Sequence, residues 1–218
     1  MCGVWTLGGA CAACVRDFAP ARMRCDGCAL AMPRDAGPGL CGACLREPPP
    51  WRAATCAVDY VFPWDGLVQA FKFANQPELA GLLSDTFVRE LRRRAPALDI
   101  DVLLPVPLSD RRLRHRGYDQ AWELVRTLGK ALHVRTSART LQRVVDTAPQ
   151  SSLDRTARAV NLRGAFRVDP VRRGDIAGKR VALVDDVMTT GASFRAATQA
   201  LVDAGARSVD VWCVARTP

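Results

Sequence analysis

The sequence predicts an α/β fold with a mostly parallel sheet, preceded by a small cysteine-rich region. After residue 50, short β-branched and apolar runs alternate with segments of helical periodicity. Seven of the nine cysteines lie within residues 1–44. The run Glu47-Pro48-Pro49-Pro50 follows them and reads as a linker, because proline is excluded from helix interiors and central strands. We therefore expect a metal-binding region at 1–50 and a second domain at 51–218.

The second region contains the periodic segments. Helical spacing covers residues 67–91, with an interruption near Pro77, and residues 119–132 and 193–204. Asp119 is expected to cap its helix, and Gly205 to end the last one. Strands are expected at residues 55–62, 101–107, 180–184 and 208–215. Helices between successive strands favour parallel pairing.

Composition restricts the class of protein. With 49% hydrophobic and 24% charged residues in 218, the chain is an ordinary globular protein rather than a disordered or coiled-coil one. No apolar run reaches 18 residues, and residues 1–15 lack the basic start of a signal peptide, so we expect a cytoplasmic protein without membrane insertion. The net charge of +9 favours polyanionic partners, although a solvated basic face would give the same balance.

Two Cys-x2-Cys knuckles, Cys25/Cys28 and Cys41/Cys44, indicate a structural zinc site of four thiolates. A region this short cannot bury a sufficient core, so the metal would supply folding energy. Disulfides or free thiols are the alternative, and the absence of a secretory signal disfavours disulfides. Cys56 and Cys213 lie in apolar runs and are expected to be buried.

Further cysteines leave the pairing open. Cys11 and Cys14 form a third knuckle, which could itself pair with Cys25 and Cys28. Cys2-Gly3 looks like the second half of another knuckle. Either its first cysteine would precede Met1, or that site has three thiolates and a substitute ligand.

The run VALVDDVMTTGAS at residues 181–193 predicts a phosphate site. A strand ends in two carboxylates, Asp185 and Asp186, which can accept hydrogen bonds from sugar hydroxyls. A hydroxyl-rich turn then leads into a helix, whose N-terminus favours an anion; the turn consists of Thr189, Thr190, Gly191, Ala192 and Ser193. The turn lacks the Gly-Lys-Ser/Thr of a Walker A loop. These groups together predict a ligand such as ribose 5-phosphate; the alternative is solvated aspartates and a capping Ser193.

That run resembles the phosphoribosyl pyrophosphate (PRPP) binding motif of type I phosphoribosyltransferases. Nearly the whole chain resembles the ComF family of competence-associated proteins, which couple a zinc ribbon region to such a domain. The resemblance also covers the knuckles and the segments Phe71-Lys72-Phe73, Pro105-Val106-Pro107, Arg116-Gly117-Tyr118-Asp119-Gln120, Thr147-Ala148-Pro149-Gln150, Arg158 and Asn161-Leu162-Arg163-Gly164-Ala165-Phe166.

The resemblance implies roles for these residues. Asp185 and Asp186 would be the catalytic pair that holds the ribose hydroxyls, and Thr189, Thr190, Gly191, Ala192 and Ser193 would cradle the 5-phosphate, with magnesium bound alongside PRPP. The loop after residues 101–107 would bind pyrophosphate. Four arginines crowd it, of which Arg116 is the foremost candidate; they are Arg111, Arg112, Arg114 and Arg116. His115 is expected to be an ordinary loop residue rather than a general base.

Two positions depart from the family pattern, which has Phe at Tyr118 and Asn at Asp119. A carboxylate at 119 would weaken binding if it contacted an anion, and would be nearly neutral if it only capped the helix. Residues 139–163 are expected to form a mobile segment over the site, with Arg143, Gln150, Arg158 and Asn161 as its polar candidates.

The sequence therefore predicts a PRPP-binding protein with structural zinc and with magnesium, linked through its resemblance to DNA uptake in natural transformation. Whether it acts as a transferase stays open, as do its acceptor and oligomeric state. The alternative is a non-enzymatic factor that binds single-stranded DNA or a partner and reuses the phosphoribosyl site. A third possibility treats the cysteine region as a docking module for a helicase or another competence protein.

Overall fold

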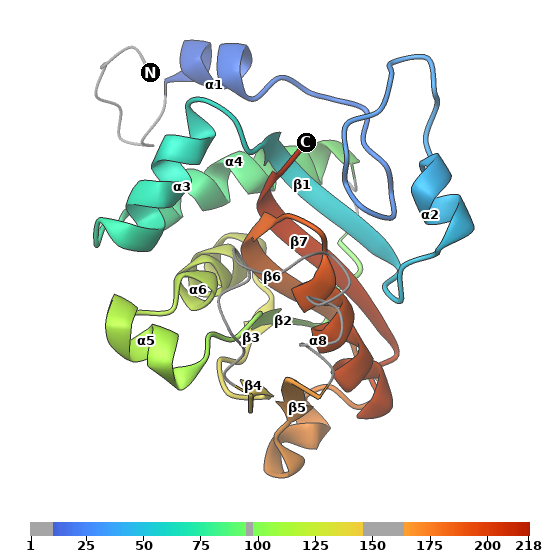
Figure 1. Ribbon diagram of the computed structural model, residues 1–218, viewed down its shortest axis with the longest axis vertical. Coiled ribbons are helices and arrows are strands. Elements are labelled where there is room, and N and C mark those ends of the chain that lie inside the picture. The colour runs from blue at the N-terminus through green and yellow to red at the C-terminus, as the bar shows by residue number, and fades with distance from the viewer. Residues whose placement is uncertain (1–10, 95–97, 146–163) are drawn as a thin grey trace.

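The computed structural model describes residues 11–94, 98–145 and 164–218 (Figure 1). Its centre is a five-stranded sheet in the order β1-β7-β6-β2-β3, and every neighbouring pair in it is parallel. The strands are β1 (Ala53–Asp59), β2 (Val102–Pro105), β3 (Arg135–Thr136), β6 (Arg180–Met188) and β7 (Ser208–Arg216). The mostly parallel α/β architecture expected from the sequence is confirmed.

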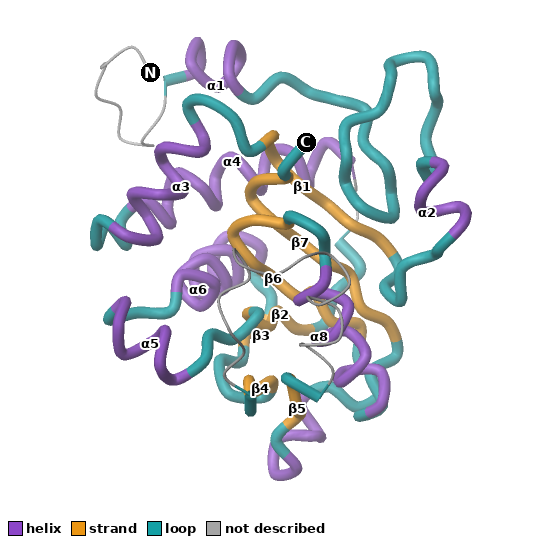
Figure 2. The backbone as a smooth tube through the Cα atoms, viewed as in Figure 1, coloured by secondary structure: helices purple, strands orange, loops and turns teal. Residues whose placement is uncertain are grey.

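Helices cover both faces of this sheet (Figures 1 and 2). Because side chains alternate along a strand, Leu103 and Ala182 pack towards one face, while Leu104 and Leu183 pack towards the other. The first face carries α3 (Trp64–Phe73), α4 (Leu79–Arg94) and α6 (Gln120–Leu132), and the second carries α8 (Ala192–Asp203). The result is a three-layer domain in which the central strands are buried on both sides, as parallel sheets require.

The smaller elements lie around this core. An antiparallel pair, β4 (Leu141–Arg143) and β5 (Phe166–Val168), precedes the 3-10 helix η2 (Pro170–Asp175). The cysteine-rich region contributes the two short helices α1 (Ala12–Phe18) and α2 (Gly42–Arg46). None of the described helices combines the length and apolar character needed to cross a bilayer.

Two local expectations change. The strand expected at residues 180–184 continues to Met188, so Asp185 and Asp186 lie within β6 rather than beyond its end. The segment after β2 was expected to be a loop, but it forms the helix α5 (Asp110–Arg116). Its start is stabilised because the Ser109 side chain accepts a hydrogen bond from the Arg112 backbone N–H. The interruption expected near Pro77 is confirmed, because it separates α3 from α4.

The cysteine-rich region packs against the sheet. The Ala54 N–H donates to the Asp26 carbonyl oxygen at 2.7 Å, and buried Arg24 forms an ion pair with Asp59 at 2.7 Å. Ala29 is fully buried in the same hydrophobic cluster as the α8 face of the sheet. The two regions expected from the sequence are therefore joined by hydrogen bonds and by a shared core.

Candidate functional site

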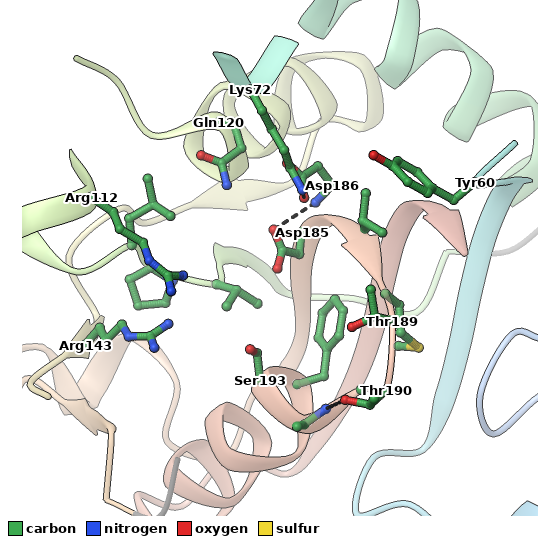
Figure 3. Close-up of a pocket in the computed structure, with 18 of the residues that line it drawn as sticks. Tyr60, Lys72, Arg112, Gln120, Arg143, Asp185, Asp186, Thr189, Thr190 and Ser193 are labelled. Carbon is green, nitrogen blue, oxygen red and sulfur yellow. Dashed lines mark hydrogen bonds and ion pairs between the residues drawn. The ribbon is translucent and has the colours of Figure 1, made fainter. Parts of the chain in front are cut away.

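A pocket of about 280 Å³ lies at the carboxyl ends of β1, β2 and β6 (Figure 3). Three chain segments that leave these strands line it: Tyr60 after β1, Val106 to Leu108 after β2, and the residues that end β6 and begin α8. The neighbouring strands β2 and β6 connect to helices on opposite faces of the sheet, α6 and α8. This divergence opens a crevice at the strand ends, where ligands of open α/β sheets bind.

Asp185 and Asp186 form the floor of this pocket. Asp186 is only 2% exposed, and its Oδ1 lies 2.9 Å from the Lys72 Nζ on α3. Its Oδ2 is buried and has no hydrogen-bond partner within the described residues. Asp185 Oδ1 accepts a hydrogen bond from the Asp186 N–H at 2.9 Å. The Asp186 Oδ2 is therefore an acceptor oxygen without a protein donor among the described residues. A site for sugar hydroxyls needs such an acceptor.

The electrostatics of this floor couple three groups. Burial, together with the neighbouring Asp186 carboxylate, raises the pKa of Asp185 well above its ordinary value, while Lys72 acts against the rise. Burial alone would lower the pKa of Lys72, but the Asp186 and Asp185 carboxylates outweigh it and raise that pKa. Lys72 therefore stays protonated beside the acidic pair.

The turn between β6 and α8 forms the lower wall, and we call residues 189–193 the phosphate loop. Gly191 has a φ of +77° and stands at the N-cap of α8, a conformation that a side chain would strain. Thr189 and Thr190 are exposed, and the Thr190 hydroxyl accepts a hydrogen bond from the Ala192 N–H at 3.3 Å. Figure 3 shows the Ser193 hydroxyl pointing into the pocket. Hydroxyl groups and a helix N-terminus thus converge in an arrangement whose chemistry suits an anion.

Arginines line the side of the pocket opposite Tyr60. Figure 3 shows Arg112 and Arg143 pointing into the space from that side. Arg116 also lines the pocket; its guanidinium donates to the Gln120 Oε1 and lies 5.0 Å from the centre of the Phe73 ring. The pocket lining given by the described residues does not include Arg111, Arg114 or His115. Of the four arginines considered from sequence, two face the pocket.

Asp119, the departure from the family pattern, caps a helix. Its carboxylate accepts a hydrogen bond from the Trp122 N–H at 3.1 Å and begins α6, as the sequence indicated. Burial raises the pKa of Asp119 despite these hydrogen bonds. Since Asp119 is absent from the pocket lining, its carboxylate acts on the helix terminus, where an Asn would serve equally well.

Lys72, Tyr60 and Gln120 line the pocket although sequence reasoning gave none of them a role. The segment Phe71-Lys72-Phe73 carried part of the family resemblance, and that was the one available signal for Lys72. Gln120 is buried at the start of α6, directly behind the cap. The candidates Gln150, Arg158 and Asn161 lie outside the described residues.

A second group of functional side chains lies in the cysteine-rich region. We call Cys25, Cys28, Cys41 and Cys44 the thiol cluster, because their sulfur atoms all lie within 4.8 Å of one another. The Cys28 and Cys41 Sγ atoms are 3.7 Å apart. A tetrahedral site with Zn–S bonds of about 2.3 Å requires sulfur pairs about 3.8 Å apart, so the cluster fits zinc.

Backbone geometry supports this cluster. Cys25 Sγ accepts hydrogen bonds from the Cys41 N–H at 3.1 Å and from the Gly27 N–H at 3.3 Å. A Cβ at position 27 would lie 2.9 Å from Cys44 Sγ, so only glycine fits there. These bonds would stabilise thiolate charge and orient the ligands.

The structure groups the Cys25/Cys28 and Cys41/Cys44 knuckles into this cluster, and not the Cys11/Cys14 knuckle. Cys11 stands at the N-cap of α1, where its sulfur accepts a hydrogen bond from the Cys14 N–H at 3.4 Å. A role for Cys11 and Cys14 at a separate site would require Cys2, which lies outside the described residues. Cys56 and Cys213 are fully buried, facing each other across β1 and β7.

Comparison with known proteins agrees with this geometry. Residues 115–218 match the family model described as "Phosphoribosyl transferase domain". The chain is 35% identical over 213 residues to DNA utilization protein YhgH of Escherichia coli K12, covering 96% of this chain and 91% of that protein. It is also 35% identical over 180 residues to Competence protein F of Haemophilus influenzae, covering 81% of this chain and 78% of that protein. The chain belongs to the ComF family.

Among solved structures, this ComF-family chain is similar to adenine phosphoribosyltransferase from Saccharomyces cerevisiae. The identity is 21% and the TM-score 0.41, with 66% of this chain and 72% of that chain covered. The family model covers residues 115–218 of this chain. The pocket is lined by residues of that part and also by earlier ones: Tyr60, residues of α3, Val106 to Leu108 and Arg112.

Proposed function

We propose that the pocket binds PRPP together with magnesium, and that the protein acts as a phosphoribosyltransferase. The observation that carries this proposal is that the acidic pair Asp185/Asp186, the phosphate loop and the guanidinium groups of Arg112 and Arg116 line one pocket. Each group complements a different part of PRPP. The ribose, the 5-phosphate and the pyrophosphate of PRPP together account for all three groups of side chains.

The phosphate loop would hold the 5-phosphate, because backbone N–H groups at the start of α8 and the hydroxyls of Thr189, Thr190 and Ser193 are suited to an anion. The acidic pair would accept hydrogen bonds from the ribose hydroxyls. Arg112 and Arg116 would bind the pyrophosphate, since guanidinium groups match phosphate oxygens in shape and charge.

Magnesium fits the same place. The buried Asp186 Oδ2 has no partner among the described residues, and carboxylates and phosphate oxygens are the ligands that this ion prefers. Bound magnesium would neutralise charge on the pyrophosphate as it leaves. In the transfer, a nitrogen nucleophile forms a bond to ribose carbon 1, and the bond from that carbon to the pyrophosphate oxygen breaks. The electron pair departs with pyrophosphate, and the nitrogen loses its proton to solvent.

Calorimetric titration with PRPP, with and without magnesium, tests this function. We expect saturable binding that requires magnesium, and a loss of at least about tenfold in affinity for Asp185→Asn, because a sugar hydroxyl loses its charged acceptor. Asp203→Asn, at the far end of α8, is the matched control and should bind as wild type. No binding by the wild-type protein, or unchanged binding by Asp185→Asn, would refute the proposal.

A second candidate function is binding of single-stranded DNA, favoured by one exposed ring at the pocket. Phe73 is 73% exposed, and the Arg116 guanidinium stacks on it at 5.0 Å. Exposed aromatic rings beside arginines are typical stacking platforms for unpaired bases. The names of the two curated relatives, which refer to DNA utilization and to competence, agree with a role in DNA uptake.

Fluorescence anisotropy with a labelled oligonucleotide tests this candidate. We expect the affinity for the oligonucleotide to fall steeply as the salt concentration rises. At a fixed salt concentration, Phe73→Ala should bind about tenfold more weakly than the wild-type protein. Phe62→Ala is the matched control, since Phe62 is 72% exposed but packs on Phe18, away from the pocket. Absence of binding at low salt excludes this candidate.

For the rest of the chain we propose a zinc-stabilised region at 1–50, joined to the phosphoribosyltransferase domain at 51–218, in a protein of the cytoplasm. The thiol cluster supports this location, since thiolate ligands persist in reducing compartments. The region is also a candidate docking surface for a helicase or another competence protein, which a pull-down with the full-length chain would identify.

A further inference from the structure

The knuckle of Cys25 and Cys28 makes hydrogen bonds that lead to the phosphate loop. The first contact is made by Trp51, whose side chain is 7% exposed. Its indole N–H donates to the Gly27 carbonyl oxygen at 2.7 Å. The far edge of the same ring reaches Gly191, where a Cβ would lie 3.4 Å from Trp51 Cη2. One rigid side chain therefore spans from the knuckle to the N-cap of α8.

The second contact is made by Arg216 at the end of β7. Its Nε donates to the Cys28 carbonyl oxygen at 2.8 Å, and its Nη1 donates to the Met188 carbonyl oxygen at 3.1 Å. Arg216 is 8% exposed. Met188 directly precedes the phosphate loop, and its carbonyl oxygen also accepts the Thr217 N–H at 3.1 Å. This arginine therefore joins the knuckle to the residue that precedes the loop.

The two contacts are complementary. They start at consecutive carbonyl groups of the knuckle, Gly27 and Cys28. They end at Met188, directly before the phosphate loop, and at Gly191 in its middle. The knuckle itself is fixed by the thiol cluster, since Cys25 and Cys28 are two of its four ligands and Gly27 lies against Cys44. A change in the knuckle would thus shift the start and the middle of the loop together.

Both side chains are buried and need hydrogen-bond acceptors, and they find them in the knuckle. The indole N–H of Trp51 requires an acceptor once it is buried, and the Gly27 carbonyl oxygen supplies it at 2.7 Å. Within the described residues, the hydrogen bonds of Arg216 run to main-chain carbonyl oxygens, which places a buried cation between two segments. Buried guanidinium groups are costly unless their donors are satisfied, so both segments are held in register by it.

We propose that Trp51 and Arg216 are positioning residues that transmit the geometry of the metal-bound knuckle to the phosphate loop. The proposal rests on the proposed function only for the identity of the ligand, and the geometric coupling stands without it. By linkage, occupancy of the loop and retention of the metal must then stabilise each other to the same degree.

Hydrogen exchange read out by mass spectrometry tests the coupling directly on the zinc-loaded full-length protein. In Trp51→Phe, which keeps a ring but loses the N–H, we expect the peptide over residues 188–194 to exchange about fivefold faster, the factor that loss of one hydrogen bond gives. Arg216→Lys, which cannot reach both carbonyl groups, should do the same. Peptides over β2 and α6 should be unchanged.

Two matched controls separate positioning from general destabilisation. Trp64→Phe also removes a buried indole N–H bond, here to the Phe18 carbonyl oxygen at 2.6 Å, but it lies away from the knuckle. Arg180→Lys weakens bonds to Asp99 and Asp101 at the opposite end of β6. Neither should alter exchange at residues 188–194. Unchanged exchange there in both Trp51→Phe and Arg216→Lys, with zinc retained, would overturn the proposal.

Metal removal supplies a second readout. We expect metal-free wild-type protein that remains folded by circular dichroism to show the same faster exchange at residues 188–194, and the Trp51→Phe/Arg216→Lys double variant to show no further effect of metal removal. A loop whose exchange is independent of the metal in the folded wild-type protein would contradict the proposal. If the loop responds to the metal but PRPP does not bind, the proposed function fails while the coupling holds.

Discussion

The Lys72 ammonium lies 2.9 Å from the Asp186 carboxylate, and this pair joins α3 to β6 beneath the pocket. Both groups are largely removed from water, and the second oxygen of Asp186 stays without a protein donor among the described residues. The cation compensates the charge of the buried carboxylate. Under the proposed function, the stability of the fold and the binding of the ligand would depend on the same contact.

Lys72→Met should lower the free energy of unfolding by about 3 kcal/mol, because it leaves a buried carboxylate without its partner. Urea denaturation followed by circular dichroism measures this. Lys130→Met, on the exposed side of α6, should change little. The double variant Lys72→Met/Asp186→Asn should recover much of the loss, and a failure to recover any would show that the ion pair is not the cause.

Asp185→Asn should stabilise the protein at neutral pH. The pKa of Asp185 is raised in the folded protein, chiefly by burial and next by Asp186, so the folded state holds this proton more tightly than the unfolded state. The stabilising contribution is therefore present below the unfolded-state pKa and is lost as the pH rises through the folded-state pKa. Thermal unfolding across a pH series should show the advantage of the variant at pH 7 and its disappearance in acid. A less stable variant at pH 7 would contradict this account of the acidic pair.

Gly191→Ala should damage the phosphate loop. A φ of +77° opposes a side chain there, and we expect a loss of about 1–2 kcal/mol in the free energy of unfolding together with loss of phosphate binding. Gly174→Ala is the matched control, since nothing lies within 4 Å of the added carbon. Equal stability of the two variants by denaturant unfolding would speak against the strained loop.

Arg112→Gln should weaken PRPP binding about tenfold, because one charge-assisted contact to the pyrophosphate is lost. Ribose 5-phosphate has no pyrophosphate, so its affinity should not change. Arg111→Gln, on the same helix but outside the pocket lining, provides the comparison. Calorimetry with both ligands measures the difference, and equal losses for both would place Arg112 elsewhere on the ligand.

Zinc binding should depend on the thiol cluster and not on the Cys11/Cys14 knuckle. Cys25→Ser and Cys41→Ser should each lose the zinc of the cluster, whereas Cys11→Ser should keep it, because only the former sulfur atoms lie in the four-thiol group. Metal analysis of the purified variants measures retention. Loss of the cluster's zinc in Cys11→Ser would mean that the knuckles pair differently.

Contiguous features of the site could be predicted from the sequence. Asp185, Asp186 and the phosphate loop follow one another along the chain, so a strand, a turn and a helix suffice to bring them together. Two knuckles at a suitable spacing likewise predict four converging thiolates, but the sequence left open which knuckles pair. The structure pairs Cys25/Cys28 with Cys41/Cys44.

Long-range partners could not be predicted in this way. Lys72 meets Asp186 because α3 packs against the sheet beside β6, and no local pattern gives that register. Of the four arginines after β2, only Arg112 and Arg116 line the pocket, because the segment is the helix α5 and they lie four residues apart on it. The expectation of a loop gave no means to choose among the four. Trp51 and Arg216 carry no motif, and their role depends on how the cysteine-rich region packs on the sheet.

A crystal structure of the protein with PRPP and magnesium tests the central claim most directly. The account predicts the 5-phosphate on the N–H groups and hydroxyls of residues 189–193, the ribose hydroxyls on Asp185 and Asp186, and the pyrophosphate facing Arg112 and Arg116. Density for the ligand at any other surface, with the turn between β6 and α8 empty under saturating PRPP, would contradict it.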